Sequence, residues 1–232
     1  MMKYIYLITT ISLMAITHTL AQHYEVRKIP VAGLQITGRG DSPAWQDAAE
    51  LSAFSYPWRE DTPPSTAFRA LWDGIYFYFL YRATGPVIVT PQTGEPEKDV
   101  LSSSRVEIFF KADDNMDPYY TLELDALGRI FDAECRYYRH VDAAWAWPEG
   151  QLIVRASRDE GGYTVEGAIS IGSLQQLGML HANRLQAGLY RAEYLPHTDG
   201  PTETRWISWI QPDSAKPDFH IPSSFGLLIL QE

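Results

Sequence analysis

Hydrophobic and polar residues alternate with a period of two along much of this chain. The pattern is clearest at residues 105–111. One face of this segment carries Val106, Ile108 and Phe110, and the other carries Arg105, Glu107 and Phe109. Because successive side chains of a strand point to opposite sides, the alternation predicts a β-strand with one apolar face. Glu107 is then expected on the face turned away from the apolar side.

Similar short segments recur along the chain and predict a β-rich fold. We expect further strands at residues 66–72, 75–82, 119–125, 128–138, 151–157, 163–170, 184–195, 205–210 and 225–230. Asp73-Gly74 between the first two predicts a tight hairpin. Helical signals are confined to residues 43–51 and 171–177, where Ser170 and Gly178 mark the ends of the second segment. Many short strands separated by turn residues favour an all-β fold, an antiparallel β-sandwich with one or two short helices.

Two segments rich in proline and glycine, residues 83–104 and 196–204, are expected to be long loops. The chain shows no internal repeat. Residues 22–232 are therefore interpreted as one domain, long enough to bury a sizeable core.

Residues 1–21 have the pattern of a secretory signal peptide. Lys3 precedes an apolar run over residues 4–20, and small residues lead to a cleavage site between Ala21 and Gln22. We expect a secreted or periplasmic protein with no stable membrane insertion after cleavage. The only cysteine, Cys135, lies far from this site, which excludes a lipid-modified N-terminus.

The charge of the chain limits the kind of partner. It carries 29 acidic and 19 basic residues, for a net charge of −10. A surface this acidic repels nucleic acid and anionic membranes, and it is compatible with a neutral glycan.

Aromatic residues are the main candidates for binding. Seven Trp and 14 Tyr exceed what one core is expected to need. An exposed Trp can stack on the apolar face of a sugar ring, with little entropy lost on ordering. Trp147 and Trp209 are taken as candidates. Because Trp206 and Trp209 are three residues apart, a strand puts them on opposite faces, one in the core. The alternative is that all these rings fill the core.

Catalytic and metal-binding signals are weak. Asp113, Asn115 and Asp117 have the spacing of a calcium loop, but the rest of the EF-hand pattern fails, so we expect no cofactor beyond a looser Ca²⁺ site as an alternative to a solvated turn. No nucleophile elbow is present. Glu107 and Glu123 lie on different predicted strands and could face one cleft, which keeps a glycan-degrading hydrolase open as an alternative function.

Several motifs together resemble a known family. In order, they are Pro43-x-Trp45, residues 71–77 (Leu-Trp-Asp-Gly-x-Tyr-Phe), residues 105–110 (Arg-Val-Glu-Ile-Phe-Phe), residues 163–169 (Tyr-Thr-Val-Glu-Gly-Ala-Ile), Trp206-x-x-Trp209 and residues 218–226 (Asp-Phe-His-Ile-Pro-x-x-Phe-Gly). This set resembles the family 9-like carbohydrate-binding modules, β-sandwiches related to the DOMON fold. The signal segment also resembles those of secreted Bacteroidetes proteins.

The resemblance implies a glycan ligand held between two aromatic side chains. Glu107 matches a residue that hydrogen-bonds sugar hydroxyls, with Arg105 beside it, and Phe219 falls near one stacking aromatic. Phe219 lies in a proline-rich loop, where it is either an exposed platform or a plug over the core. The second aromatic is expected just before Val106, but residues 99–104 contain none, so Trp58 or Trp147 is a candidate replacement.

We therefore expect a non-catalytic carbohydrate-binding domain that takes part in extracellular polysaccharide binding or breakdown, with a glycoside hydrolase as a potential partner. A second alternative, a haem-binding DOMON-type protein, needs axial Met and His ligands facing one cavity, and Met116 and Met179 are the methionines considered.

Overall fold

A computed structural model describes residues 22–31, 33–197 and 200–232. The signal-peptide prediction falls on residues 1–21, outside the described residues. The described chain is mostly β, as the sequence predicted. Its strands are β1 (His23–Lys28), β2 (Thr66–Trp72), β3 (Tyr76–Thr84), β4 (Arg105–Lys111), β5 (Tyr119–Asp125), β6 (Ile130–Arg136), β7 (His140–Asp142), β8 (Leu152–Asp159), β9 (Gly162–Ser170), β10 (Leu180–His181), β11 (Arg184–His197), β12 (Gly200–Ser208) and β13 (Gly226–Leu230). Its short helices are α1 (Pro96–Leu101) and α2 (Ile171–Gln176), with 3₁₀ turns at Pro43–Asp47 and Pro222–Ser224.

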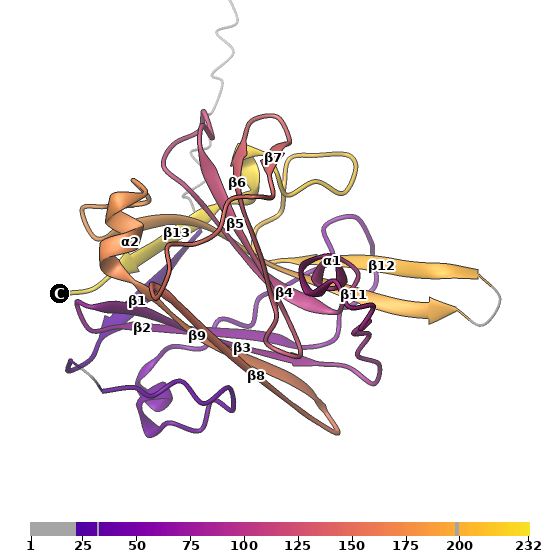
Figure 1. The fold of residues 1–232 in the computed structure, drawn as a ribbon, viewed down its shortest axis with the longest axis horizontal. Coiled ribbons are helices and arrows are strands. Elements are labelled where there is room, and N and C mark those ends of the chain that lie inside the picture. The colour runs from indigo at the N-terminus through magenta and orange to yellow at the C-terminus, as the bar shows by residue number, and fades with distance from the viewer. Residues whose placement is uncertain (1–21, 32, 198–199) are drawn as a thin grey trace, which may run out of the picture.

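The strands form one curved sheet of mixed direction, so the predicted purely antiparallel arrangement is wrong (Figure 1). The strand order is β7-β6-β5-β4-β11-β13-β1-β2-β3-β9-β8, with β10 and β12 paired to β11. Strand β1 causes the difference, because it runs parallel both to β13 and to β2. It pairs with β13 through residues 23–26 and with β2 through residues 27–28, so one short strand joins the two halves of the sheet.

The main core lies against the apolar face predicted for residues 105–111. Val106, Ile108 and Phe110 are fully buried in it, whereas Phe109 belongs to a separate aromatic cluster on the other face. Burying a side chain of this size contributes about 1.5–3 kcal/mol. The alternation in β4 therefore fixes which residues can reach the site described below.

The predicted hairpin and the second helix are confirmed. Asp73 accepts hydrogen bonds from the backbone N–H groups of Ile75 and Tyr76, and Gly74 has φ +89°, a value that favours glycine. The Ser170 side chain caps α2 by accepting from the N–H of Ser173, and Gly178 follows the helix with φ +73°.

Both predicted long loops contain regular structure instead. Residues 83–104 include α1, which starts with proline in its first turn, a position where the missing N–H costs nothing. Residues 196–197 lie at the end of β11 and residues 200–204 in the paired strand β12, and the pairing shifts register between Leu195 and His197. Pro196 sits at this irregularity, where a missing backbone donor is tolerated. Within the described residues, no helix is both long and apolar enough to cross a bilayer.

Candidate functional site

A small pocket, here called the carboxylate pocket, opens on the face of β4 opposite the core. Its floor is formed by β4 and β5, which contribute Arg105, Glu107, Phe109 and Glu123. Glu107 and Glu123 are cross-strand partners in the β4–β5 register, so both point into the pocket. Its rim comes from Arg139, Trp206 and residues 217–220.

One arginine serves both carboxylates. Arg105 Nε lies 2.9 Å from Glu107 Oε1 and 2.6 Å from Glu123 Oε2. The Arg105 guanidinium is almost fully buried, and its Nη1 donates to the carbonyl of Leu101 (3.0 Å) and to the Tyr194 hydroxyl (3.3 Å). The single positive charge of Arg105 thus faces two buried carboxyl groups, and it can neutralise only one of them when both are ionised.

The carboxylates also lack hydrogen bonds of good geometry. Among the described residues, Glu107 Oε1 and Glu123 Oε2 have no hydrogen-bond partner, although both lie at ion-pair distance from Arg105. Burial raises the pKa of Glu107 to about 8, against the lowering effect of Arg105, and burial also raises the pKa of Glu123. Both oxygens are shielded from solvent and lie 2.6–2.9 Å from Arg105 Nε, so Arg105 holds the two carboxyl groups by charge at imperfect hydrogen-bond geometry.

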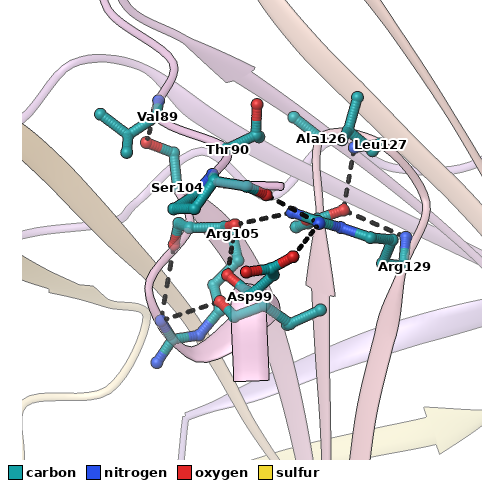
Figure 2. Close-up of polar contacts among 12 residues, drawn as sticks. Val89, Thr90, Asp99, Ser104, Arg105, Ala126, Leu127 and Arg129 are labelled. Atoms are coloured by element: carbon teal, nitrogen blue, oxygen red, sulfur yellow. Dashed lines mark hydrogen bonds and ion pairs between the residues drawn. The ribbon is translucent and has the colours of Figure 1, made fainter. Parts of the chain in front are cut away.

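Helix α1 and the turn after β5 hold Arg105 in place (Figure 2). Arg105 donates a hydrogen bond to the carbonyl of Leu101, the last residue of α1. The helix itself is fixed by Arg129, whose guanidinium contacts Asp99 (3.1 Å), Asp125 (2.6 Å) and the carbonyl of Pro91 (2.8 Å). The segment before β4, which contains α1, therefore positions the Arg105 guanidinium beside the two carboxyl groups.

Phe219 lines the pocket but is not an open platform. Its side chain is 5% exposed, and its ring stacks on Tyr190 with the centroids 4.0 Å apart and an interplanar angle of 7°. Trp58 and Trp206 pack against it at 5.4 and 5.8 Å. The expectation of an exposed stacking ring is thus corrected. One face is occupied by Tyr190, and the ring acts as a plug that supports the pocket wall.

The residues around Phe219 form a polar rim. Asp218 accepts hydrogen bonds from the Tyr138 hydroxyl (2.5 Å), the His220 N–H (2.9 Å) and Arg139 (2.8 Å). Burial disfavours ionisation of Asp218, but these donors outweigh it, so its pKa lies below the ordinary value. Burial, assisted by Arg139, lowers the pKa of His220 to about 4, so its ring is neutral at pH 7 and contacts the Tyr119 hydroxyl through Nδ1.

A second depression, the Trp cleft, adjoins the pocket. It is lined by Trp58, Arg59, Thr204, Arg205, Trp206, Ala215 and Pro217. Trp206 and Pro217 line both hollows, so the two are continuous. Trp58 and Trp206 are only partly buried, and Trp206 also lines the carboxylate pocket.

Of the predicted site residues, Arg105, Glu107 and Phe219 come together in this pocket, and Trp147 and Trp209 do not. Trp147 is buried in the main core, where its Nε1 donates to Ser173 Oγ (3.1 Å). Trp209 is also buried there, against Gly226, where an added Cβ would lie 2.7 Å from the indole ring. Neither ring can stack on a ligand. The two rings lie in different clusters, with Trp206 at the site and Trp209 in the core, although Trp209 lies just beyond the end of β12 and not in the strand as predicted.

The remaining candidates lie elsewhere. Asp113 accepts from the Asn115 N–H, Asp114 pairs with Lys111, and Asp117 lies 3.5 Å from Arg136. Among the described residues, no three His, Cys, Asp or Glu side chains gather as a metal-binding group, and the looser calcium site stays a prediction.

The two methionines named as haem ligands are buried in different clusters. Met116 packs with Tyr119 and Cys135, and Met179 lies in the main core. Met179 lines one depression together with His181, so the haem alternative stays a prediction.

The sequence matches the model of the carbohydrate family 9 binding domain-like family over residues 36–232. The chain belongs to this family. No curated protein matches the sequence. Among solved structures, it is similar to a candidate carbohydrate-binding protein from Bacteroides uniformis, with 16% identity, a TM-score of 0.70 and coverage of 91% of this chain and 100% of the other. Bacteroides uniformis belongs to the Bacteroidetes, the group whose signal segments residues 1–21 resemble.

The fold is also similar to a family 9 module from Caldicellulosiruptor kristjanssonii, solved in complex with glucose and with cellotriose. The identities are 17% and 16%, both TM-scores are 0.56, and each alignment covers 90% of this chain and 96% or 94% of the other. At these identities the likeness supports the fold. The ligand of this chain has to be argued from its own pocket.

Proposed function

We propose that this family 9 member binds a glycan without catalysing its breakdown, and that the terminal sugar unit enters the carboxylate pocket. The observation that carries the proposal is the pair of carboxyl groups, those of Glu107 and Glu123, that lines the floor of the pocket and shares one arginine. Sugar hydroxyls both donate and accept hydrogen bonds, so they match an ionised as well as a protonated carboxyl group. The glucose and cellotriose bound by the C. kristjanssonii module agree with this ligand class.

The aromatic surface beside the carboxylates supports the same ligand. Trp206 borders both the pocket and the Trp cleft, and Trp58 lines the cleft. A pyranose has polar edges and apolar C–H faces, so it needs acceptors at its edge and a ring against its face. Trp206 takes the role that the sequence had given to Phe219.

A hydrolytic function is the second candidate, because a carboxyl with a pKa raised to about 8 can act as a general acid. The arrangement of the pair favours binding instead. Glycosidases place two carboxyl groups on either side of the scissile bond. Here Glu107 and Glu123 occupy adjacent strands on one floor and contact the same Nε atom.

We further propose that the protein is exported and serves polysaccharide use outside the inner membrane, alongside a glycoside hydrolase. The apolar segment at residues 4–20 and the site at Ala21 support export. The acidic net charge suits a neutral glycan partner and disfavours nucleic acid.

Isothermal titration calorimetry against a panel of soluble mono- and oligosaccharides tests the proposal. The wild-type protein should bind at least one sugar, and Glu107→Gln should weaken that binding. Glu160→Gln, on the exposed β8–β9 turn, is the matched control and should leave it unchanged. Chromatography of the same sugars after incubation should reveal no cleavage. Product formation would favour the hydrolase, and a folded protein that binds nothing would contradict the proposal.

A further inference from the structure

A third depression adjoins the carboxylate pocket and shares Ala215 and Pro217 with the Trp cleft. This Tyr138 depression is lined by Tyr138, Arg139 and residues 214–218. It shares Arg139, Pro217 and Asp218 with the carboxylate pocket. The β6–β7 hairpin, which carries Tyr138, and the loop after β12 lie side by side at one end of the molecule (Figure 1). A ligand in the pocket can therefore continue into this depression around one loop.

Tyr138 is an exposed ring held at its tip. The residue is 50% exposed. Its hydroxyl donates a hydrogen bond to Asp218 Oδ2 and accepts one from Arg139 Nε at 3.2 Å. Single exposed aromatics are ordinary on protein surfaces. The neighbouring Tyr137, equally exposed at 51%, does not line the depression. Tyr138 differs from Tyr137 in two ways: its hydroxyl is hydrogen-bonded to Asp218, and it lines the depression. A ring fixed in this way loses little entropy when a ligand stacks on it.

The depression also offers a free hydrogen-bond donor. Lys216 is exposed and lines it, and within the described residues its ammonium group makes no ion pair. Its backbone is fixed by the Ser214 hydroxyl, which donates to the Lys216 carbonyl at 2.7 Å. An aromatic wall with a nearby donor matches the face and the edge of a pyranose, the same chemistry as in the carboxylate pocket.

We propose that the Tyr138 depression is a second sugar subsite, so that the protein recognises a linear oligosaccharide whose terminal unit lies in the carboxylate pocket. The next units of the chain pass over Pro217 and stack on Tyr138. This inference rests on the proposed function and adds to it a direction and a minimum length. The competing path leaves the pocket through the Trp cleft, along Trp206 towards Trp58.

The test compares four neutral monosaccharides, glucose, xylose, mannose and galactose, each with its linear β-1,4-linked trisaccharide. The quantity measured is the ratio of monosaccharide Kd to trisaccharide Kd for the sugar that binds. We expect a ratio of about ten in the wild-type protein, equivalent to about 1.4 kcal/mol for the added contacts. The ratio should fall below about three in Tyr138→Ala and stay near ten in Tyr137→Ala.

Tyr138→Phe separates the ring from its tether. It keeps the aromatic face and removes the hydroxyl that binds Asp218, so its ratio should remain well above that of Tyr138→Ala. Tyr138→Phe also tests the subsite if Tyr138→Ala disturbs the rim of the pocket. In every variant, the ratio of the two Kd values cancels effects that are common to both sugars. Trp58→Ala should leave the ratio unchanged.

Four results would overturn the subsite. A wild-type ratio near one, or a ratio unchanged in Tyr138→Ala, removes the subsite while monosaccharide binding keeps the proposed function intact. A ratio lost in Trp58→Ala and retained in Tyr138→Ala assigns the chain to the Trp cleft. If the folded protein binds none of the eight sugars, the proposed function fails and the subsite fails with it.

Discussion

Glu107 and Glu123 face each other across β4 and β5, and Arg105 is their common counter-charge, with its Nε within 2.9 Å of an oxygen of each. A single guanidinium balances one carboxylate, so the second is favoured in its neutral form when no ligand is bound. The elevated pKa of Glu107 follows from this arrangement and from burial. Both carboxyl groups line the pocket, where they can hydrogen-bond to a ligand.

This pair predicts a pH-dependent stability. The folded pKa of Glu107, about 8, lies above the ordinary value of 4.5, so above pH 4.5 the folded protein retains a proton that the unfolded chain releases. The free energy of unfolding should therefore fall as the pH rises from about 5 to 8. Thermal unfolding at pH 5, 6.5 and 8 should give a Tm that decreases by several degrees. Glu107→Gln should flatten this slope and Glu160→Gln should preserve it; an equal slope in all three proteins would contradict the shift.

Phe219 should be a stability residue. Because its ring is buried and stacked on Tyr190, Phe219→Ala removes a plug and leaves a cavity, at a cost of about 3–5 kcal/mol. Chemical denaturation measures this loss directly. Phe219→Leu, which retains most of the volume, should cost much less. An alanine variant with unchanged stability and weakened sugar binding would restore the platform role.

The sequence predicted the floor of the site because β4 has a strict alternation. The period of two placed Arg105, Glu107 and Phe109 on one face without knowledge of any other strand. The hairpin at Asp73-Gly74 and the cap at Ser170 were predictable for a similar reason, since both depend on local backbone geometry. The separation of Trp206 from Trp209 was also expected, although β12 ends at Ser208 and the strand geometry used for that prediction does not extend to Trp209.

Non-local contacts account for what the sequence could not predict. Nothing in the spacing shows which of Trp206 and Trp209 is in the core; the close approach of Gly226 to Trp209 decides it. Phe219 was placed in a loop correctly, but its exposure depends on Tyr190, 29 positions earlier in the chain. The parallel pairing of β1 likewise depends on β13 at the other end of the chain.

The signal segment gives a prediction that needs only the exported protein. Small residues before Gln22 place the cut after Ala21, so N-terminal sequencing of the secreted or periplasmic form should start at Gln22 or His23. Replacing Ala21 with Arg should block processing. Recovery of intact Met1 in the membrane fraction of the wild type would instead identify the segment as an anchor.

The two tryptophans near the C-terminus should separate binding from stability. Trp206 is partly exposed at the pocket, so Trp206→Ala should weaken sugar binding by about 1–3 kcal/mol with a modest change in Tm. Trp209 is buried in the main core, so Trp209→Ala should lower stability by about 3–5 kcal/mol. Calorimetric titration and denaturation of both variants check the pair. If Trp206→Ala lost stability and Trp209→Ala lost only sugar binding, Trp209 would be the binding residue and Trp206 the core residue.

Arg129 should act on binding from a distance. It lies outside the carboxylate pocket, yet it holds Asp99 and Asp125 and so fixes α1, whose Leu101 carbonyl accepts from Arg105 (Figure 2). Arg129→Ala removes the cation between two carboxylates and should lower the Tm by about 5 °C or more. Arg82→Ala, which breaks an exposed pair with Asp159, is the control and should change the Tm little. If α1 presets Arg105, the Arg129 variant also binds sugar more weakly at a temperature where it is fully folded. Unchanged affinity there would mean that Arg105 keeps its position without the helix.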